Sequence, residues 1–273
     1  MFIADVREPA VSGMFYDYDK RELNEGLKDL FKAVPKGAYR CVISPHAGYV
    51  YSGRTAAHAI NGLSEGTKKF IVIGPNHNAI GPLFSIMNSG VWRTPIGDCK
   101  IDQKLANILL QYEPLQADTS AHQFEHSVEV QLPFLQHRFK QFTFAPIVIR
   151  NISHSGTFLS ECEKLGSKIA QVMKKDKTIS VIASSDFSHY VPQKIADEKD
   201  GMAIERIKTL DTKGFFKVLR ETGASICGYG GITAVMQVAK DLSLKAELIH
   251  KSSSGDVTKD FDSVVAYYAI GFR

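Results

Sequence analysis

Short apolar runs alternate along the chain with longer segments in which apolar residues recur every three or four positions. The short runs are rich in β-branched residues, and several end at Gly, Pro or Ser, which is typical of strands buried on both faces. They cover residues 39–44 (YRCVIS), 68–74 (KKFIVIG), 142–149 (FTFAPIVI) and 178–185 (TISVIASS).

The longer segments predict amphipathic helices. In the first of them, 19–34, Asp19 is placed to cap the helix and Glu22 completes a capping-box pattern. Pro133 lies inside a later helical pattern and predicts a kink there. The remaining predicted helices cover 53–62, 101–112, 126–139, 156–175, 194–209, 211–222 and 230–241.

The last two strand-like runs, 245–252 and 263–272, are separated by a turn around Gly255 and predict an antiparallel hairpin at one edge of a sheet. Strands separated by helices of this length favour a mostly parallel sheet covered on both faces. The expected fold class is therefore α/β with three layers: a mostly parallel central sheet, helices on both faces and an antiparallel edge hairpin. No internal repeat, low-complexity segment or linker is visible, so we expect one domain over residues 1–273.

Composition narrows the class of protein. Of the 273 residues, 44% are apolar and 23% charged, and 33 basic residues against 29 acidic ones leave a formal charge of +4. The basic residues form no block or stripe interleaved with aromatics, so nucleic-acid binding is not expected. No apolar run is long enough to cross a membrane, and no secretion signal is visible. Four cysteines form no CxxC pair, so we expect free thiols in a cytoplasmic protein.

Three histidines follow three of the predicted strands. His46 comes after the strand ending at Ser44, His77 follows 68–74, and His189 follows 178–185. In an open parallel sheet, ligands bind in the crevice outside the carboxyl ends of the strands. One such histidine is more often an ordinary hydrogen-bonded loop residue, but three at equivalent ends favour a common site.

Two other features fit this site, and each has a plainer interpretation. Glu125, His126 and Glu129 stand at the start of a predicted helix, where they serve either the site or only the helix terminus. Cys227 lies in a Gly-rich segment just before another helix, whose N-terminus can lower a thiol pKa and favour the metal-binding thiolate. The plainer interpretation of Cys227 is a buried structural cysteine.

Two neutral imidazoles and one anionic ligand form a set suited to non-haem iron(II), copper or zinc. A third histidine nearby can act as a general acid or base near neutral pH, and we assign His189 to this role. Asp186, three residues earlier, is placed either to orient His189 or to support the metal.

Several longer motifs identify a family resemblance. REPAVSGMFY, PHAGYVYSG, GPNHN, EHSVEVQLPFL, SSDFSHY and ICGYGGI occur in the order and spacing of the Memo family, whose prokaryotic branch is called AmmeMemoRadiSam system protein B. The match covers essentially the whole chain. This family resembles the class III extradiol (LigB-like) dioxygenases, which hold iron(II) with two histidines and a glutamate and use another histidine as acid and base.

The resemblance implies a LigB-like scaffold and a role for each matching residue. His46 and His77 match the two histidine ligands, His189 matches the acid–base histidine, and Cys227 takes the place of the glutamate. A thiolate is softer than a carboxylate and is itself oxidisable, which argues against ring cleavage but leaves metal and redox chemistry open. Iron(II) is the first expectation, with copper or zinc as alternatives.

The animal members of the family are described as mediators of cell motility that bind phosphotyrosine peptides, iron or copper. Phe15 stands where those proteins carry a tryptophan beside the cleft. We assign Glu125, His126 and Phe15 to contacts with a small molecule or peptide.

Two classes of function remain open from the sequence. The first is a mononuclear metal-dependent redox protein related to the extradiol dioxygenases. The second is a non-catalytic module that holds a peptide or small ligand in the same cleft, which the lost glutamate favours. A zinc hydrolase would need a general-base glutamate beside the ligands, and none is obvious in the sequence.

Overall fold

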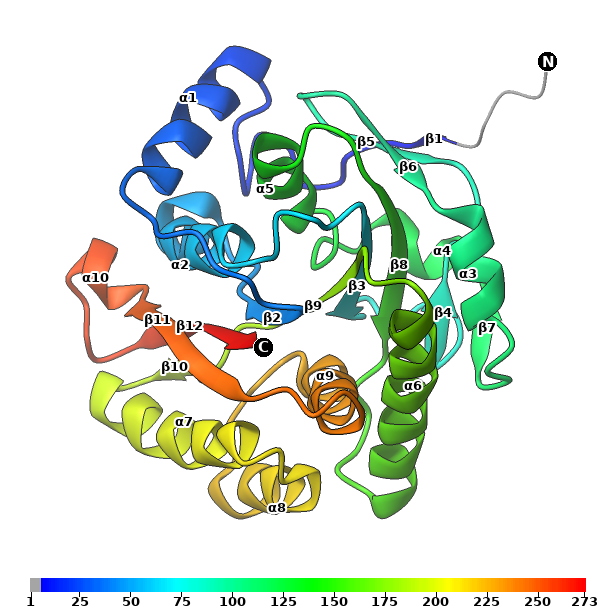
Figure 1. Ribbon diagram of the computed structural model, residues 1–273. Coiled ribbons are helices and arrows are strands. Elements are labelled where there is room, and N and C mark those ends of the chain that lie inside the picture. The colour runs from blue at the N-terminus through cyan, green and yellow to red at the C-terminus, as the bar shows by residue number, and fades with distance from the viewer. Residues whose placement is uncertain (1–5) are drawn as a thin grey trace.

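The computed structural model describes residues 6–273 and has twelve strands in one sheet (Figure 1). Four parallel strands form its centre, in the order β8 (Thr143–Ile149), β3 (Lys69–Pro75), β9 (Ile179–Ser184) and β2 (Cys41–Ser44). These are the four strands predicted from the apolar runs.

Beyond β2 the sheet becomes antiparallel. The long strand β12 (Val264–Phe272) pairs with β2, with β11 (Ala246–Ser253) and with the short β10 (His189–Val191). The β11–β12 pair is the predicted edge hairpin, and the short helix α10 (Gly255–Thr258) lies in its connection.

The other side of the sheet is built from short strands. They are β6 (Asp98–Ile101), β5 (Val91–Arg93), β1 (Val6–Arg7), β4 (Phe84–Ile86) and β7 (Leu115–Ala117).

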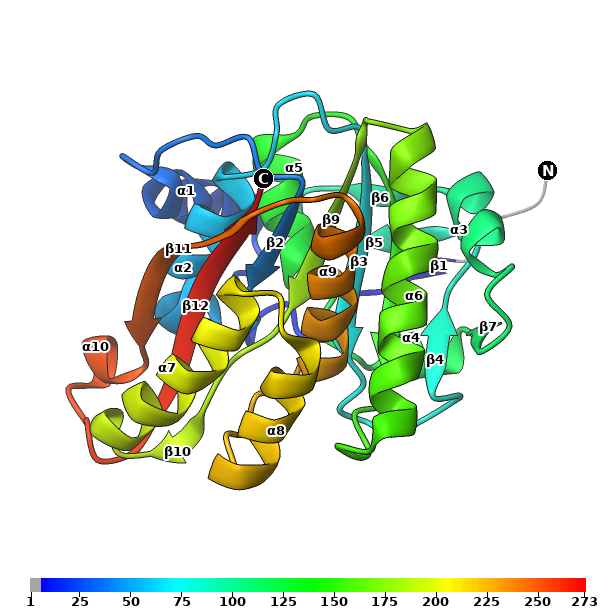
Figure 2. The ribbon, with the colours of Figure 1, turned by 60° about the horizontal axis from the view of Figure 1, so that its bottom comes forward.

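Helices cover both faces of the sheet (Figures 1 and 2). One face carries α1 (Lys20–Phe31), α2 (Tyr49–Asn61), α5 (Gln131–Arg138) and the short α4 (Ser120–Gln123). The other carries α3 (Gln103–Leu109), α6 (Gly156–Lys175), α7 (Gln193–Lys208), α8 (Thr212–Thr222) and α9 (Tyr229–Asp241). The predicted fold class, a three-layer α/β arrangement with a mostly parallel sheet, is confirmed.

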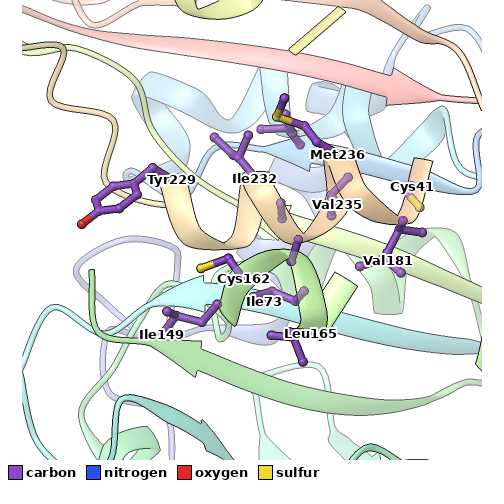
Figure 3. Packing of buried hydrophobic residues seen from close by; sticks show 14 of the residues in the cluster. Cys41, Ile73, Ile149, Cys162, Leu165, Val181, Tyr229, Ile232, Val235 and Met236 are labelled. Carbon is purple, nitrogen blue, oxygen red and sulfur yellow. The ribbon is translucent and has the colours of Figure 1, made fainter. Parts of the chain in front are cut away.

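Successive side chains of the central strands point to opposite faces of the sheet, so each strand contributes to two hydrophobic cores. In β3, Ile71 and Ile73 face the core under α6 and α9, whereas Phe70 and Val72 face the core under α2 and α5. Figure 3 shows the first core, where side chains of α6 and α9 meet those of the strands. These two helices pack so closely that a Cβ on Gly166 would lie 2.4 Å from the carbonyl oxygen of Ala234, so this position requires glycine.

Two predicted helices begin later than expected. The pattern at 101–112 contains the end of β6, then Asp102, which caps α3 by accepting from Leu105 N. The pattern at 126–139 becomes the helix α5 only from Gln131, so Pro133 falls in the first turn. Proline is tolerated there because the first N–H groups of a helix have no intrahelical partner. The predicted kink is therefore wrong.

Among residues 6–273 there is no helix with the length and hydropathy that crossing a membrane requires.

Candidate metal centre

His46, His77 and Cys227 meet at the carboxyl ends of the central strands. Their potential ligand atoms all lie within 4.8 Å of one another. The Cys227 Sγ is 3.3 Å from His46 Nε2, and the imidazole rings of His46 and His77 have centroids 5.3 Å apart. In a tetrahedral metal site, N and S ligands lie about 3.5 Å apart. The types and spacing of these three donors therefore fit a transition-metal ion.

The fold explains why residues so far apart in sequence converge. β2 and β9 pair in register up to Ser44 and Ser184, and β3 lies on the other side of β9. The chain leaves β2 toward His46 and β3 toward His77 at the same edge of the sheet. Cys227 reaches this edge because it immediately precedes α9, whose N-terminus lies there.

His46 is almost completely buried, with 2% of its surface exposed. Burial, and then the neighbouring His126, His77 and His189, lower the pKa of His46 well below its ordinary value. The ring is therefore neutral at physiological pH. Only a neutral imidazole has the lone pair that metal binding requires.

His77 is held by Glu125. The Nδ1 of His77 lies 3.0 Å from Glu125 Oε1, and its backbone N–H donates to Oε2 at 2.6 Å. An ionised carboxylate can only accept, so Nδ1 carries a proton, and the neutral form of the ring has its lone pair on Nε2. A carboxylate in this position commonly fixes the orientation of a metal-binding histidine.

Glu125 stays ionised although its side chain has no exposed surface. Burial alone would raise the pKa of Glu125, but the hydrogen bond from His77, the charges of His77 and His126 and the N–H of Ser127 outweigh it and lower the pKa to about 2. Because it lies beneath His77, Glu125 is better placed to orient that ring than to contact a substrate. Substrate contact stays a prediction for His126 and Phe15.

Cys227 differs from the sequence-based expectation in its protonation. Burial, and then the carboxylate of Asp186, raise the thiol pKa above its ordinary range, although the N–H of Asp186 donates to Sγ at 3.2 Å. The position before α9 therefore does not lower the pKa of this thiol. A cation beside Sγ would supply the charge that favours the thiolate.

Asp186 faces His46. Its Oδ1 accepts from the backbone N–H of His46 at 2.9 Å, and its Oδ2 lies 4.0 Å from His46 Nε2. Burial raises the pKa of this carboxyl. Among residues 6–273 Asp186 makes no hydrogen bond to His189. Of its two predicted roles, these contacts favour support of the metal site over orientation of His189.

Ser225 orients His189 instead. The backbone N–H of His189 donates to Ser225 Oγ at 2.8 Å, and His189 Nδ1 lies 2.8 Å from the carbonyl oxygen of Ser225. A carbonyl only accepts, so the lone pair of neutral His189 is on Nε2. His189 is not among the residues that could ligate the same ion as His46, but it lies near enough for its charge to act on His46 and Asp186.

His126 and Phe15 form another wall of the site. The His126 ring stacks on His77 with centroids 4.7 Å apart, and the ring of Phe15 lies 4.8 Å from that of His126. His126 also belongs, with His77 and Glu125, to a second group of closely spaced potential ligands that shares His77 with the first.

Glu129 binds the N-terminal segment of the chain, a role that differs from both of the alternatives predicted for it. Its buried carboxylate accepts from the side chains of Arg7 and Tyr16 and from the backbone N–H groups of Ala10 and Val11. Arg7 in turn donates to the carbonyl oxygen of Glu125 at 2.7 Å. Glu129 therefore attaches the segment that carries Phe15 to the loop that carries Glu125 and His126.

Comparison with known proteins agrees with the motifs. The family model described as Memo-like protein matches residues 7–271. A MEMO1 family protein of Thermoplasma volcanium is 40% identical, and the match covers 97% of each chain. MEMO1 family proteins of Sulfurisphaera tokodaii and Methanosarcina barkeri are each 39% identical, covering 98% and 97% of this chain and 99% of their own. With this match over nearly its whole length, the chain belongs to the Memo family.

Proposed function

We propose that this protein binds one transition-metal ion through His46, His77 and Cys227 and that the site serves redox-related chemistry. The observation that carries the proposal is the convergence of two imidazoles and a thiol within 4.8 Å. Iron(II) is the first candidate, and copper or zinc are the alternatives, because imidazole and thiolate ligands suit all three.

Charge supports a divalent ion at this position. Glu125 is ionised and buried against His77, and the Cys227 thiolate would add a second negative charge. Buried anions are costly unless a cation compensates them. The Asp186 carboxylate beside His46 adds further negative charge, so a divalent ion would compensate more of the buried charge than copper(I) would.

The other residues have roles that follow from their contacts. Glu125 holds His77, and Asp186 fixes the backbone of His46. His189 has its Nε2 available to accept or return a proton, while His126 and Phe15 would contact a small molecule or peptide. Bound iron or copper would supply redox activity and open coordination positions, whereas zinc has no redox chemistry of its own and would act as a Lewis acid.

The second candidate is a non-catalytic binding module that holds a small ligand or peptide in the same cleft. Cys227 favours it, because a thiol stands where the extradiol enzymes that the family resembles have a carboxylate. We infer no role in nucleic-acid or membrane binding. The four free cysteines fit a reducing compartment such as the cytoplasm.

The test is metal binding by the tag-free, full-length protein under anaerobic conditions. We expect one equivalent of iron(II), copper(I) or zinc to bind, and His46→Ala and Cys227→Ser to weaken binding at least tenfold while the protein stays folded. His137→Ala is a matched control, because His137 packs against Phe31 away from the site. Absence of stoichiometric metal, or binding by both site variants at parental affinity, would contradict the proposal and favour the binding module.

A further inference from the structure

A buried hydrogen-bond network surrounds the ring nitrogen of His46 that does not face Cys227. The hydroxyl oxygen of Ser184 lies 2.9 Å from His46 Nδ1, 3.0 Å from Gln131 Nε2 and 2.6 Å from the carbonyl oxygen of Ser127. Ser127, Gln131 and Ser184 have no exposed surface. Buried polar groups must satisfy one another, so the direction of each hydrogen bond can be worked out.

The orientation of the Gln131 amide follows from its other partners. Its Nε2 is 2.8 Å from the carbonyl oxygen of Pro45, which can only accept. Its Oε1 accepts from the hydroxyl of Ser44 at 2.8 Å. A reversed amide would place two carbonyl oxygens against each other, so Nε2 is the donor and gives its second proton to Ser184.

The Ser184 hydroxyl has one proton and two lone pairs. The carbonyl oxygen of Ser127 can only accept, so the proton points there, and one lone pair accepts from Gln131. The remaining lone pair faces His46 Nδ1 and can only accept from it. If the Ser184 hydroxyl instead donated to His46, no donor among residues 6–273 would reach the buried carbonyl oxygen of Ser127. That oxygen would then face a lone pair of Ser184.

We propose that Ser184 and Gln131 are positioning residues that keep the proton of His46 on Nδ1, so that the Nε2 lone pair faces Cys227 before any cation arrives. The benefit to metal binding rests on the proposed function, but the tautomer itself does not. His77 reaches the same state through the carboxylate of Glu125, whereas His46 reaches it through neutral groups.

The tautomer can be measured without metal, by ¹⁵N NMR of the full-length, chelator-treated protein with labelled histidine. In the parent we expect His46 to be protonated on Nδ1. In Ser184→Ala that acceptor is lost, and the proton should move to Nε2, which has Cys227 Sγ at 3.3 Å as an acceptor. Ser184→Thr keeps a hydroxyl and should keep the parental tautomer.

Ser180→Ala is the matched control. Ser180 is in the same strand β9 and is also buried, but within residues 6–273 its hydroxyl bonds only to Thr67, at 2.8 Å. This variant should leave the tautomer of His46 unchanged. Titration with Co²⁺, whose absorption reports thiolate ligation, should show binding weakened roughly 10- to 100-fold in Ser184→Ala, the usual effect of losing a group that orients a metal ligand. Ser180→Ala should bind Co²⁺ like the parent.

A parent protonated on Nε2, or an unchanged tautomer in folded Ser184→Ala, would overturn the proposal. If Ser184→Ala does not fold, the spectrum of the parent decides alone. If the parent has the expected tautomer but binds no Co²⁺, the proposed function fails while the assignment of Ser184 and Gln131 stands.

Discussion

At the scale of single residues, burial disfavours the thiolate form of Cys227, whereas metal ligation requires it. Burial and the Asp186 carboxylate raise the pKa of its thiol, yet a metal ligand must be a thiolate. Metal binding at this site should therefore displace a proton from Cys227.

Alkylation followed by mass spectrometry tests this role. Cys227 is only partly buried, whereas the other three cysteines are fully buried in the two cores. At mildly alkaline pH we expect metal-free protein to be labelled at Cys227 faster than at Cys41, Cys99 or Cys162. Bound metal should slow labelling of Cys227 at least tenfold and leave the other three unchanged. Equal labelling with and without independently verified metal would remove Cys227 from the site, and Asp186 would be the next candidate ligand.

His189 should behave differently from the ligands. Ser225 holds its Nδ1 side, and it does not belong to the group that could ligate the same ion as His46. His189→Ala should therefore retain metal at close to the parental affinity, because among residues 6–273 His189 makes no hydrogen bond to His46, His77 or Cys227. It should lose whatever turnover or ligand response the parent shows. Metal loss as severe as in His46→Ala would show that His189 is itself a ligand.

The candidate ligands could be predicted from sequence because imidazole and thiol side chains are chemically distinctive and stand next to recognisable strand or helix ends. The residues that orient them could not. Ser184, Gln131 and Ser225 are common residue types, and their roles depend on neighbours from other elements. The same holds for Glu129, whose position suggested a helix terminus but whose carboxylate binds the N-terminal segment.

At the scale of elements, the strength of the hydrophobic pattern decided what could be predicted. The central strands and the long helices α6 and α9 bury whole faces and leave a clear pattern. Strands such as β5 and β7 have three residues each, too few to establish an alternation. The start of α5 was misplaced because residues 126–130 continue an apolar pattern without yet forming the helix.

Helix α1 offers a test of one local signal. The carboxylate of Asp19 accepts from Arg21 N at 2.8 Å and from Glu22 N at 3.0 Å, as the capping pattern predicts. Asp19→Ala removes these bonds and should lower the free energy of unfolding by about 1 kcal/mol. Asp17→Ala, a nearby exposed change outside the helix, should cost much less. Chemical denaturation of both variants measures the difference, and an equal effect would mean that general charge, not capping, stabilises this end.

At the scale of the whole molecule, the candidate centre depends on all three layers. The sheet brings the loops after β2 and β3 to one edge, α9 places Cys227 there, and the layer with α5 supplies Gln131. Helix α7 contacts the residue just before His189 through Asp200, whose Oδ1 accepts from Ser188 Oγ at 2.7 Å and whose Oδ2 accepts from Ser188 N at 3.2 Å.

Asp200 makes global stability depend on pH. Burial is the largest cause that raises its pKa, and although the bonds from Ser188 oppose it, the pKa rises from 3.8 to about 6. Between these two values the native state binds more protons than the unfolded state, so stability falls as pH rises. Well above pH 6 the full cost of the buried charge is present, on the order of 3 kcal/mol. Below the unfolded value of 3.8 the cost disappears.

Asp200→Asn should remove this dependence. The amide oxygen can accept from Ser188 N while the amide nitrogen donates to Ser188 Oγ, because a hydroxyl can also accept. The variant should therefore be more stable than the parent by on the order of 3 kcal/mol at pH 7.5, and this advantage should vanish near pH 4. Denaturant unfolding of both proteins across this range measures it, with Glu198→Gln as a control at an exposed position of the same helix. An advantage that is constant with pH would show that the amide improves packing and that Asp200 is not destabilised by its charge.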